Sequence, residues 1–310
     1  TNINGYRNIF AVLGTLTAFA GVTVLTAGNE PSAWTTMGVI MGVVMLVSFL
    51  VPTLFVPKTH KVSMVTSEKG VLRDYLSTFT TKEFMLAAMP WMLHITGITV
   101  IQQSVPYYFN YVLGRPESQI LALASLLAGA IVSIPIWVAI SRKIGKKATY
   151  NAGMAIFAAS IFVFYFLGHR LGMGYIVSAM VVAGLGFGAQ YVMPYSILAD
   201  VIEADYDRGG RRREGIFMGQ FTFISKMGQA LAALVTGLVL RVVGFQEPEV
   251  AGEFLQQTSE ALIGIRALLG PVAVLFFVSG IIVLSFYPIT EKVYHEIRER
   301  IEKREAEHNG

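Results

Sequence analysis

Hydrophobic residues run along this chain in long segments that short polar or charged stretches separate. Eight of these segments hold close to the roughly 20 apolar residues that a membrane-spanning helix needs. Several contain Gly or Pro, which helices inside a bilayer tolerate. We therefore expect an all-α integral membrane protein. Its predicted spans are residues 8–28, 33–56, 84–108, 119–140, 148–168, 173–198, 215–240 and 266–288.

The composition supports this expectation and excludes several kinds of chemistry. Hydrophobic residues make up 54% of the chain and charged residues only 14%, against about 25% charged residues in a typical soluble domain. The absence of cysteine excludes disulfides and thiolate nucleophiles. No His and carboxylate set suggests a metal site, and no nucleophile with a base suggests an enzyme. The chain begins with Thr1, so we expect a piece that lacks its N-terminal part.

The basic residues set the expected orientation. Of the 24 Lys and Arg residues, 19 fall before the first span, in alternate loops and in the C-terminal tail. The positive-inside rule places these segments in the cytoplasm. Eight spans then return both ends to the same side, which is self-consistent. This bias accounts for the net charge of +4, and a nucleic-acid partner is not expected.

One cation interrupts a long apolar segment. Lys226 lies about ten residues into the span at 215–240, which is roughly 15 Å deep in a hydrocarbon core about 30 Å thick. A lysine at that depth costs about 3 kcal/mol on insertion scales. We expect Lys226 to face a water-filled cavity or a buried carboxylate. A substrate or ion site is the functional interpretation, and a structural ion pair between two helices is the alternative.

Other features along the chain also have both a structural and a functional interpretation. The run Gly184-Leu185-Gly186-Phe187-Gly188 has no predicted strand before it, so we interpret it as helix packing rather than a phosphate loop. His94 lies in the middle of the predicted span at 84–108. Two interpretations of it are open, a proton relay and a hydrogen-bonded core histidine. The tyrosines near the outer edge serve as interfacial anchors or stack on a sugar ring; they are Tyr107, Tyr108 and Tyr111.

The order of the spans suggests an organisation. Two helices at 1–56 are followed by a long loop at 57–83, six helices at 84–288 and a charged tail at 289–310. Transporters built from two six-helix halves join the halves by such a loop. The segment from Val71 to Leu76 is a candidate surface helix. The tail has acidic and basic residues at helical spacing, as in a solvated helix.

Three sequence segments resemble the glycoside–pentoside–hexuronide:cation symporter family of the major facilitator superfamily. They are Asn4-Gly5-Tyr6-Arg7-Asn8-Ile9-Phe10-Ala11, Pro106-Tyr107-Tyr108-Phe109-Asn110-Tyr111-Val112-Leu113-Gly114, and residues 199–230. The loop Ile140-Ser141-Arg142-Lys143-Ile144-Gly145-Lys146-Lys147 resembles the short basic loop within each half, although the general pattern has Asp in place of Arg142. The resemblance implies a major facilitator fold and assigns the eight spans here to helices 5–12 of twelve.

The resemblance also implies roles for individual residues. Arg7 matches an arginine that hydrogen-bonds sugar, and Tyr191 stands where the family has a pocket tryptophan. Lys226 and Thr222 match residues near the cation and sugar sites. A cytoplasmic gate or conformational lock is implied by a charged group, which comprises Asp200, Glu203, Arg213 and Arg142.

The resemblance implies a sugar or glycoside symporter driven by sodium or protons, in a bacterial inner membrane with both ends cytoplasmic. No cofactor is expected beyond the coupling ion. The family's aspartates for cation and sugar lie on helices one, two and four, which this chain lacks. Two alternatives remain open, a lysophospholipid-type carrier of the same superfamily and a membrane scaffold or sensor without transport.

Overall fold

The computed structural model describes residues 31–55, 71–168, 170–209, 213–246 and 255–309, with the single positions 10, 14, 17, 18, 21 and 25. The described residues are helical apart from turns and short connections. The helices are α2 (Pro31–Phe55), α3 (Val71–Thr78), α4 (Lys82–Tyr107), η1 (Tyr108–Val112), α5 (Ser118–Ile144), α6 (Lys146–Leu167), α7 (Met173–Gly209), α8 (Glu214–Val242), α9 (Ser259–Ala267), η2 (Leu268–Val272), α10 (Ala273–Ser285) and α11 (Glu291–Asn309). The two η segments are π-helices that continue neighbouring α-helices.

Seven helices in the described part of the chain are long and apolar enough to cross a membrane. They match seven of the eight predicted spans, and α9, η2 and α10 together form the last one. The prediction of an all-α integral membrane protein is therefore confirmed. The predicted span at 8–28 lies outside the described residues, apart from a few single positions.

The chain divides into two compact units, and α2 belongs to the smaller one, residues 6–68. This helix carries no charged residue and continues through Pro52 in its last turn. Its side chains are mostly exposed within its own unit, which is typical of a helix whose surroundings are lipid or other helices. The helices from α3 to α11 form the larger unit, and all the sites below lie in it.

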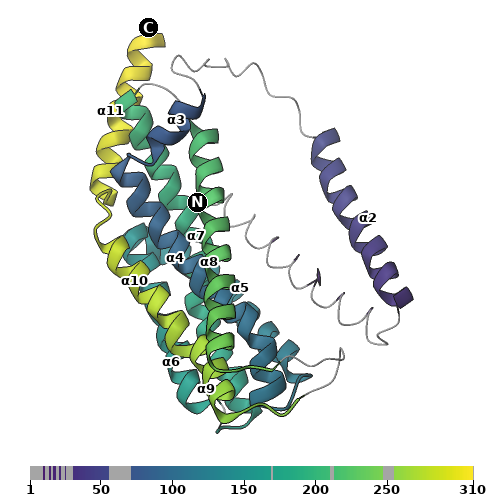
Figure 1. Cartoon of the computed structure of the whole chain (residues 1–310). Coiled ribbons are helices and arrows are strands. Elements are labelled where there is room, and N and C mark those ends of the chain that lie inside the picture. The colour runs from purple at the N-terminus through teal and green to yellow at the C-terminus, as the bar shows by residue number, and fades with distance from the viewer. Residues whose placement is uncertain are drawn as a thin grey trace. The chain divides into compact units, whose positions relative to one another are not determined.

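The larger unit is a bundle in which α7 packs between α5 and α6, while α4 packs between α8 and α10. Helix α6 also packs against α10, which joins the two groups. Figure 1 shows α3 and α11 at one end of this bundle and α9 at the other. We refer to these as the α11 end and the α9 end.

The glycine run at 184–188 brings α7 into backbone contact with both of its neighbours. A Cβ atom at Gly184 would lie 2.1 Å from the Leu126 carbonyl oxygen of α5. A Cβ atom at Gly186 would lie 2.6 Å from the backbone nitrogen of Phe157 in α6. Small residues allow helices in membranes to approach this closely. The interpretation of this run as helix packing is confirmed.

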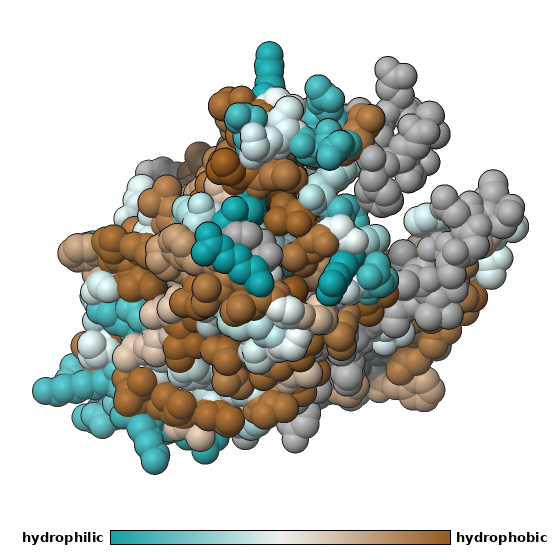
Figure 2. Space-filling model, turned by 90° about the horizontal axis from the view of Figure 1, so that it is seen from below, coloured by the Kyte–Doolittle hydropathy of each residue, from teal (hydrophilic) through white to brown (hydrophobic). Residues whose placement is uncertain are grey.

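The outward surface of the bundle is largely apolar. Val132, Leu275 and Phe286 are 62%, 64% and 70% exposed. Seen from the α9 end, hydrophobic residues cover much of the visible surface (Figure 2). Such extensive apolar exposure is unusual for a soluble protein, and it fits a bundle that is surrounded by lipid.

Several connections differ from the sequence-based expectation or sharpen it. The span predicted at 173–198 continues beyond its expected end, because residues 200–207 form the last turns of α7, which ends only at Gly209. The basic loop around residue 145 is reduced to Gly145, whose φ of 84° favours glycine. The predicted surface helix is present as α3. The tail forms α11, but Ile297 and Ile301 are buried, so it packs on the bundle.

Candidate functional site

Lys226 lies on the exposed side of α8, in the middle of that helix. Its Nζ atom donates a hydrogen bond to Oε1 of Gln229 at 3.1 Å. Within the described ranges, no carboxylate lies at ion-pair distance from this ammonium group. Thr222 lies one turn earlier and is also exposed, with its hydroxyl donating to the Met218 carbonyl at 2.9 Å. The two predicted site residues therefore share one face of α8.

This face is lined by small side chains on both sides of Lys226. Helical spacing of three and four residues places them in one stripe, and all are exposed: Gly215, Gly219, Thr222, Ala230, Ala233 and Gly237. The next exposed stripe carries large apolar side chains instead, among them Phe223, Met227, Leu234 and Leu238. Large apolar residues suit lipid, whereas small residues around a lysine leave room for water or a ligand.

An aromatic cluster fixes α8 against α4 and α7. The ring of Trp91 stacks on Phe221 with centroids 5.2 Å apart, and Tyr195 packs edge-on against both rings. The indole nitrogen of Trp91 donates to the hydroxyl of Ser225, the residue before Lys226. This hydrogen bond orients the turn of α8 that carries Lys226. This contact was not predicted from the sequence, where a tryptophan in mid-span was the available signal for the cluster.

Tyr191, the third predicted substrate residue in the described chain, lies on α7 rather than on α8. It is half-buried and packs edge-on against Phe187 at 5.0 Å between centroids. It precedes Tyr195 of the aromatic cluster by one helical turn. Arg7, the fourth predicted residue, lies outside the described residues.

His94 is a core residue in the described structure. It is 2% exposed, and its Nδ1 atom shares a hydrogen bond with the hydroxyl of buried Tyr150. Its ring also packs against Trp91 and Phe277. These contacts match the hydrogen-bonded core histidine, one of the two interpretations of this residue.

The four predicted gate residues all lie near the α11 end, but they make separate contacts. Asp200 is buried and pairs with Lys146 of α6 at 2.5 Å. Glu203 pairs with Arg298 of α11 at 3.2 Å. Both acidic residues line one pocket of about 400 Å³ together with Arg142 and the Tyr294 ring. This pocket brings three of the four residues together.

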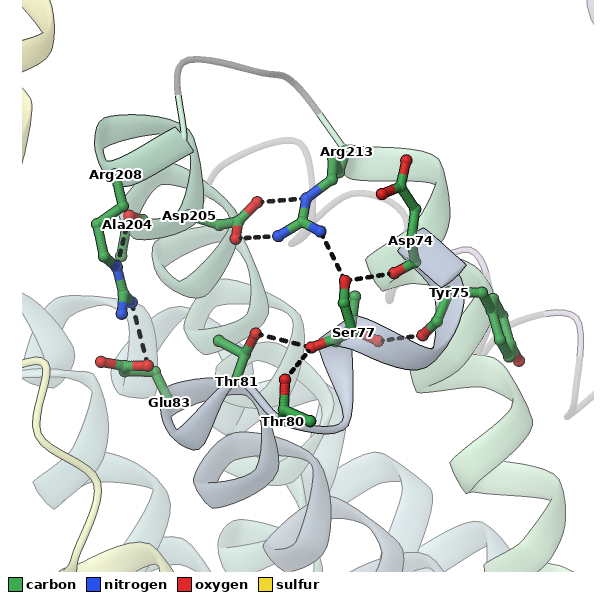
Figure 3. Close-up of polar contacts among 11 residues, drawn as sticks. Asp74, Tyr75, Ser77, Thr80, Thr81, Glu83, Ala204, Asp205, Arg208 and Arg213 are labelled. Carbon is green, nitrogen blue, oxygen red and sulfur yellow. Dashed lines mark hydrogen bonds and ion pairs between the residues drawn. The ribbon is translucent and has the colours of Figure 1, made fainter. Parts of the chain in front are cut away.

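Arg213 is the exception, because its carboxylate partner is Asp205 rather than Asp200 or Glu203. Its Nε atom donates to Asp205 Oδ2 at 2.9 Å, and Nη1 donates to the Ser77 hydroxyl of α3 at 2.9 Å (Figure 3). The bond to Asp205 stabilises the charged guanidinium and raises the pKa of Arg213. Gln220 also binds the Tyr75 carbonyl. The residues that hold α3 on α7 and α8 therefore include Asp205, which the prediction omitted.

Further ion pairs hold α11 on the end of α7. Arg300 pairs with Asp207 at 2.8 Å, and Arg304 pairs with the same carboxylate at 3.3 Å. Lys147 of α6 donates to the carbonyl oxygens of Ser285 and Tyr287 at 2.7 and 2.9 Å. The sequence predicted a solvated helix for the tail, with acidic and basic residues at the spacing of ion pairs within one helix. In the structure only Arg298 and Glu302 form such a pair among its described residues.

A bundle of apolar helices with a cation on one open helix face and a charged cluster at one end defines an integral membrane protein. The sequence comparison narrows this class. The chain matches the MFS/sugar transport protein family over residues 1–291. It belongs to this family of the major facilitator superfamily.

Known relatives are also named as transporters. An uncharacterized symporter of Synechocystis is 27% identical over 78% of this chain and 44% of its own length. A glucuronide carrier protein homolog of Escherichia coli is 27% identical over 71% of this chain and 47% of its own length. The sodium-dependent lysophosphatidylcholine symporter 1 of Gallus gallus is 26% identical over 73% of this chain and 41% of its own length. The matched part spans less than half the length of each of these relatives.

Proposed function

We propose that this chain is the C-terminal part of a cation-coupled sugar or glycoside symporter that works by alternating access. Helices α2 to α10 would then be helices 6–12 of twelve, with α4 to α10 forming the C-terminal half. The coupling ion is sodium or a proton, and its binding favours the conformation that binds sugar. The relative that is named as a glucuronide carrier supports a sugar-derived substrate.

The observation that carries the proposal is the exposed position of Lys226 on an apolar, membrane-length helix. A charge there is costly unless it faces water, a ligand or an opposite charge. The stripe of small residues around it provides space on the same face. Lys226 would take the place of a cation electrostatically or orient carboxylates from the part of the transporter that precedes this chain.

The remaining predicted residues fit this scheme as proposals. Tyr191 and Arg7 would contact the sugar, because a guanidinium offers five donors that suit paired hydroxyl groups. Thr222 would contribute to the cation site. Asp200, Glu203 and Arg142 would form part of the cytoplasmic gate, since breaking and remaking ion pairs is a common way to switch between two packed states. Arg213 would act with Asp205 by holding α3.

The test uses the full-length protein in detergent with a panel of sugars and lysolipids, with and without sodium and at two pH values. A ligand that binds only the folded state raises stability by about 2.7 kcal/mol at 100 times its Kd. We expect a sugar to raise the apparent Tm, and sodium or protons to enlarge that shift. Lys226→Ala should abolish it.

Lys303→Ala is the matched control, because Lys303 lies exposed on α11 far along the chain from the site. It should retain the full ligand-dependent shift. The proposal fails if no sugar shifts the Tm of the wild type, or if Lys226→Ala lowers stability while leaving the sugar shift intact. The second result would assign Lys226 to a structural ion pair.

A lipid carrier is the second candidate, and the relative named as a lysophosphatidylcholine symporter favours it. The large apolar stripe beside Lys226 would suit an acyl chain, and the ammonium group would suit a phosphate. In the same panel, a shift with lysolipid and none with sugar would select this candidate.

A further inference from the structure

Three membrane-length helices of the described chain end close together at the α11 end of the bundle. Two of them, α5 and α6, are joined only by Gly145, so the turn between them lies at a membrane surface. The third is α10, which ends a candidate span at Ser285. Lys147 at the start of α6 donates hydrogen bonds to the carbonyl oxygens of Ser285 and Tyr287 at 2.7 and 2.9 Å. The sequence predicts that this surface is cytoplasmic.

A pocket of about 470 Å³ lies at this turn, within the range of about 300–1,000 Å³ that is typical of small-molecule sites. Its lining includes both sides of Gly145 and the start of α11. These segments are in contact, because a Cβ atom at Gly145 would lie 3.3 Å from Cγ of Glu291. Two lining residues, Asp200 and Glu291, are acidic. Four are basic, which leaves the lining with a net charge of +2: Lys143, Lys146, Lys147 and Lys292.

Two of the four lysines have no carboxylate to neutralise them. Lys146 pairs with Asp200 at 2.5 Å, and Lys147 is held by the two carbonyl oxygens. Lys143 and Lys292 are exposed. Among the described residues, no carboxylate lies at ion-pair distance from either ammonium group. The excess positive charge of the pocket therefore lies at its exposed rim, where an anion can reach it.

The pocket also contains a hydrogen-bond acceptor that lacks a donor. Asn151 lines it from the second turn of α6. The Oδ1 atom of this side chain is buried and has no hydrogen-bond partner among the described residues. Buried acceptors without a donor are rare because they are unfavourable. An occupant that suits this pocket therefore combines a negative charge for the lysines with a hydrogen-bond donor for the amide oxygen.

Exposed apolar side chains close to the pocket indicate that its occupant comes from the bilayer. Ile144 lines the pocket and is 53% exposed. Phe286 lies between the two residues whose carbonyl oxygens bind Lys147, and it is 70% exposed. Large apolar side chains at the end of a membrane span contact lipid. A lipid can therefore place its head group among the lysines and its acyl chains beside Ile144 and Phe286.

We propose that this pocket binds the head group of one phosphatidylglycerol molecule. The phosphate contacts Lys143 and Lys292, and a glycerol hydroxyl donates a hydrogen bond to Oδ1 of Asn151. Basic pockets between membrane helices on the cytoplasmic side are typical sites for anionic lipids. Phosphatidylcholine has no net charge and no hydrogen-bond donor, so it meets neither requirement. The bound lipid joins α5 and α6 to α11, whichever substrate the protein transports.

The test measures lipid binding to the full-length protein in detergent by native mass spectrometry. We expect one phosphatidylglycerol molecule to bind more tightly than phosphatidylcholine. Each lysine near a membrane surface strengthens the binding of anionic lipid about fivefold. Lys143→Gln and Lys292→Gln should therefore each weaken phosphatidylglycerol binding about fivefold and leave phosphatidylcholine binding unchanged.

A third variant tests the hydrogen bond separately from the charge. Phosphatidylethanol has the same charge as phosphatidylglycerol but no hydroxyl group on its head group. The wild type should prefer phosphatidylglycerol over phosphatidylethanol about fivefold. Asn151→Leu, which keeps a side chain of similar size, should remove this preference. Lys143→Gln should retain it, since that variant loses only charge.

Lys303→Gln is the matched control, because Lys303 is also exposed on α11 but does not line the pocket. It should bind phosphatidylglycerol like the wild type. Equal binding of phosphatidylglycerol and phosphatidylcholine to the wild type would overturn the proposal. So would equal losses in Lys303→Gln and Lys292→Gln, the result expected if α11 attracts anionic lipid only through its overall charge. Displacement of the lipid by millimolar inorganic phosphate would assign the pocket to a soluble anion instead.

Discussion

The backbone contact between α6 and α7 predicts a specific pair of opposite mutational effects. In Gly186→Ala the new methyl group would lie 2.6 Å from the Phe157 nitrogen and 2.8 Å from the Gly153 carbonyl oxygen. Ordinary contacts of this kind are about 3.5 Å or longer, so α6 must retreat by about 1 Å. In Gly280→Ala of α10, the nearest atoms would lie at 3.5, 3.6 and 3.8 Å, and the methyl group fits.

The magnitudes follow from two opposing effects. Overpacking costs about 1–3 kcal/mol, whereas replacing Gly by Ala within a helix gains up to about 1 kcal/mol. Gly186→Ala should therefore lose about 1–2 kcal/mol, and Gly280→Ala should be neutral or gain up to about 1 kcal/mol. The two variants therefore differ by about 1–3 kcal/mol, and at roughly 2–4 °C per kcal/mol their apparent Tm values should differ by about 2–12 °C.

The assay is thermal unfolding of both variants and the wild type in the same detergent, followed by tryptophan fluorescence or circular dichroism. Chain length, detergent and type of substitution are identical, so only the packing at the two positions differs. Equal Tm values for Gly186→Ala and Gly280→Ala, or a lower value for Gly280→Ala, would refute the close packing of α6 and α7 described above.

Two further predictions concern the α11 end. Asp205→Asn weakens the charged contact with Arg213 that holds α3, so amide hydrogen exchange in residues 74–81 should accelerate severalfold; unchanged exchange would contradict this role. Burial raises the pKa of Tyr287, with Asp200 and Glu83 reinforcing the shift. The folded pKa thus exceeds the unfolded value of about 10, so the tyrosine's stabilising contribution is full below pH 10 and is lost above it. Thermal scans from pH 8 to 11 should show a smaller decline for Tyr287→Phe.

The number and position of most spans could be predicted because long apolar segments have few alternatives to a membrane helix. The position at which α7 ends could not be predicted. Residues 200–209 are rich in charge and resemble a loop, yet they stay helical where α11 packs on α7 and forms ion pairs with Glu203 and Asp207. This stabilisation comes from a helix about 90 residues later in the chain, so local sequence carries no sign of it.

In the candidate site, too, local sequence could predict some features, whereas others depend on contacts between distant parts of the chain. The cost of burying a charge was enough to predict that Lys226 lies on an open or paired face. The hydrogen bond from Trp91 to Ser225 joins positions 134 residues apart, and no local pattern predicts such a pair. The choice of Asp205 over Asp200 as the partner of Arg213 depends likewise on how α7 and α8 pack on α3.

The glycine contacts of α7 have a consequence for how such a protein changes shape. Side chains at an ordinary helix interface can change rotamer and let two helices slide, but main chains in direct contact have no such freedom. Helices α5 and α6 are also joined through the single residue Gly145. We therefore expect α5, α6 and α7 to move together as one rigid body. Rearrangement in a transport cycle would then fall to α4 and α8, the helix pair that carries Trp91 and Lys226.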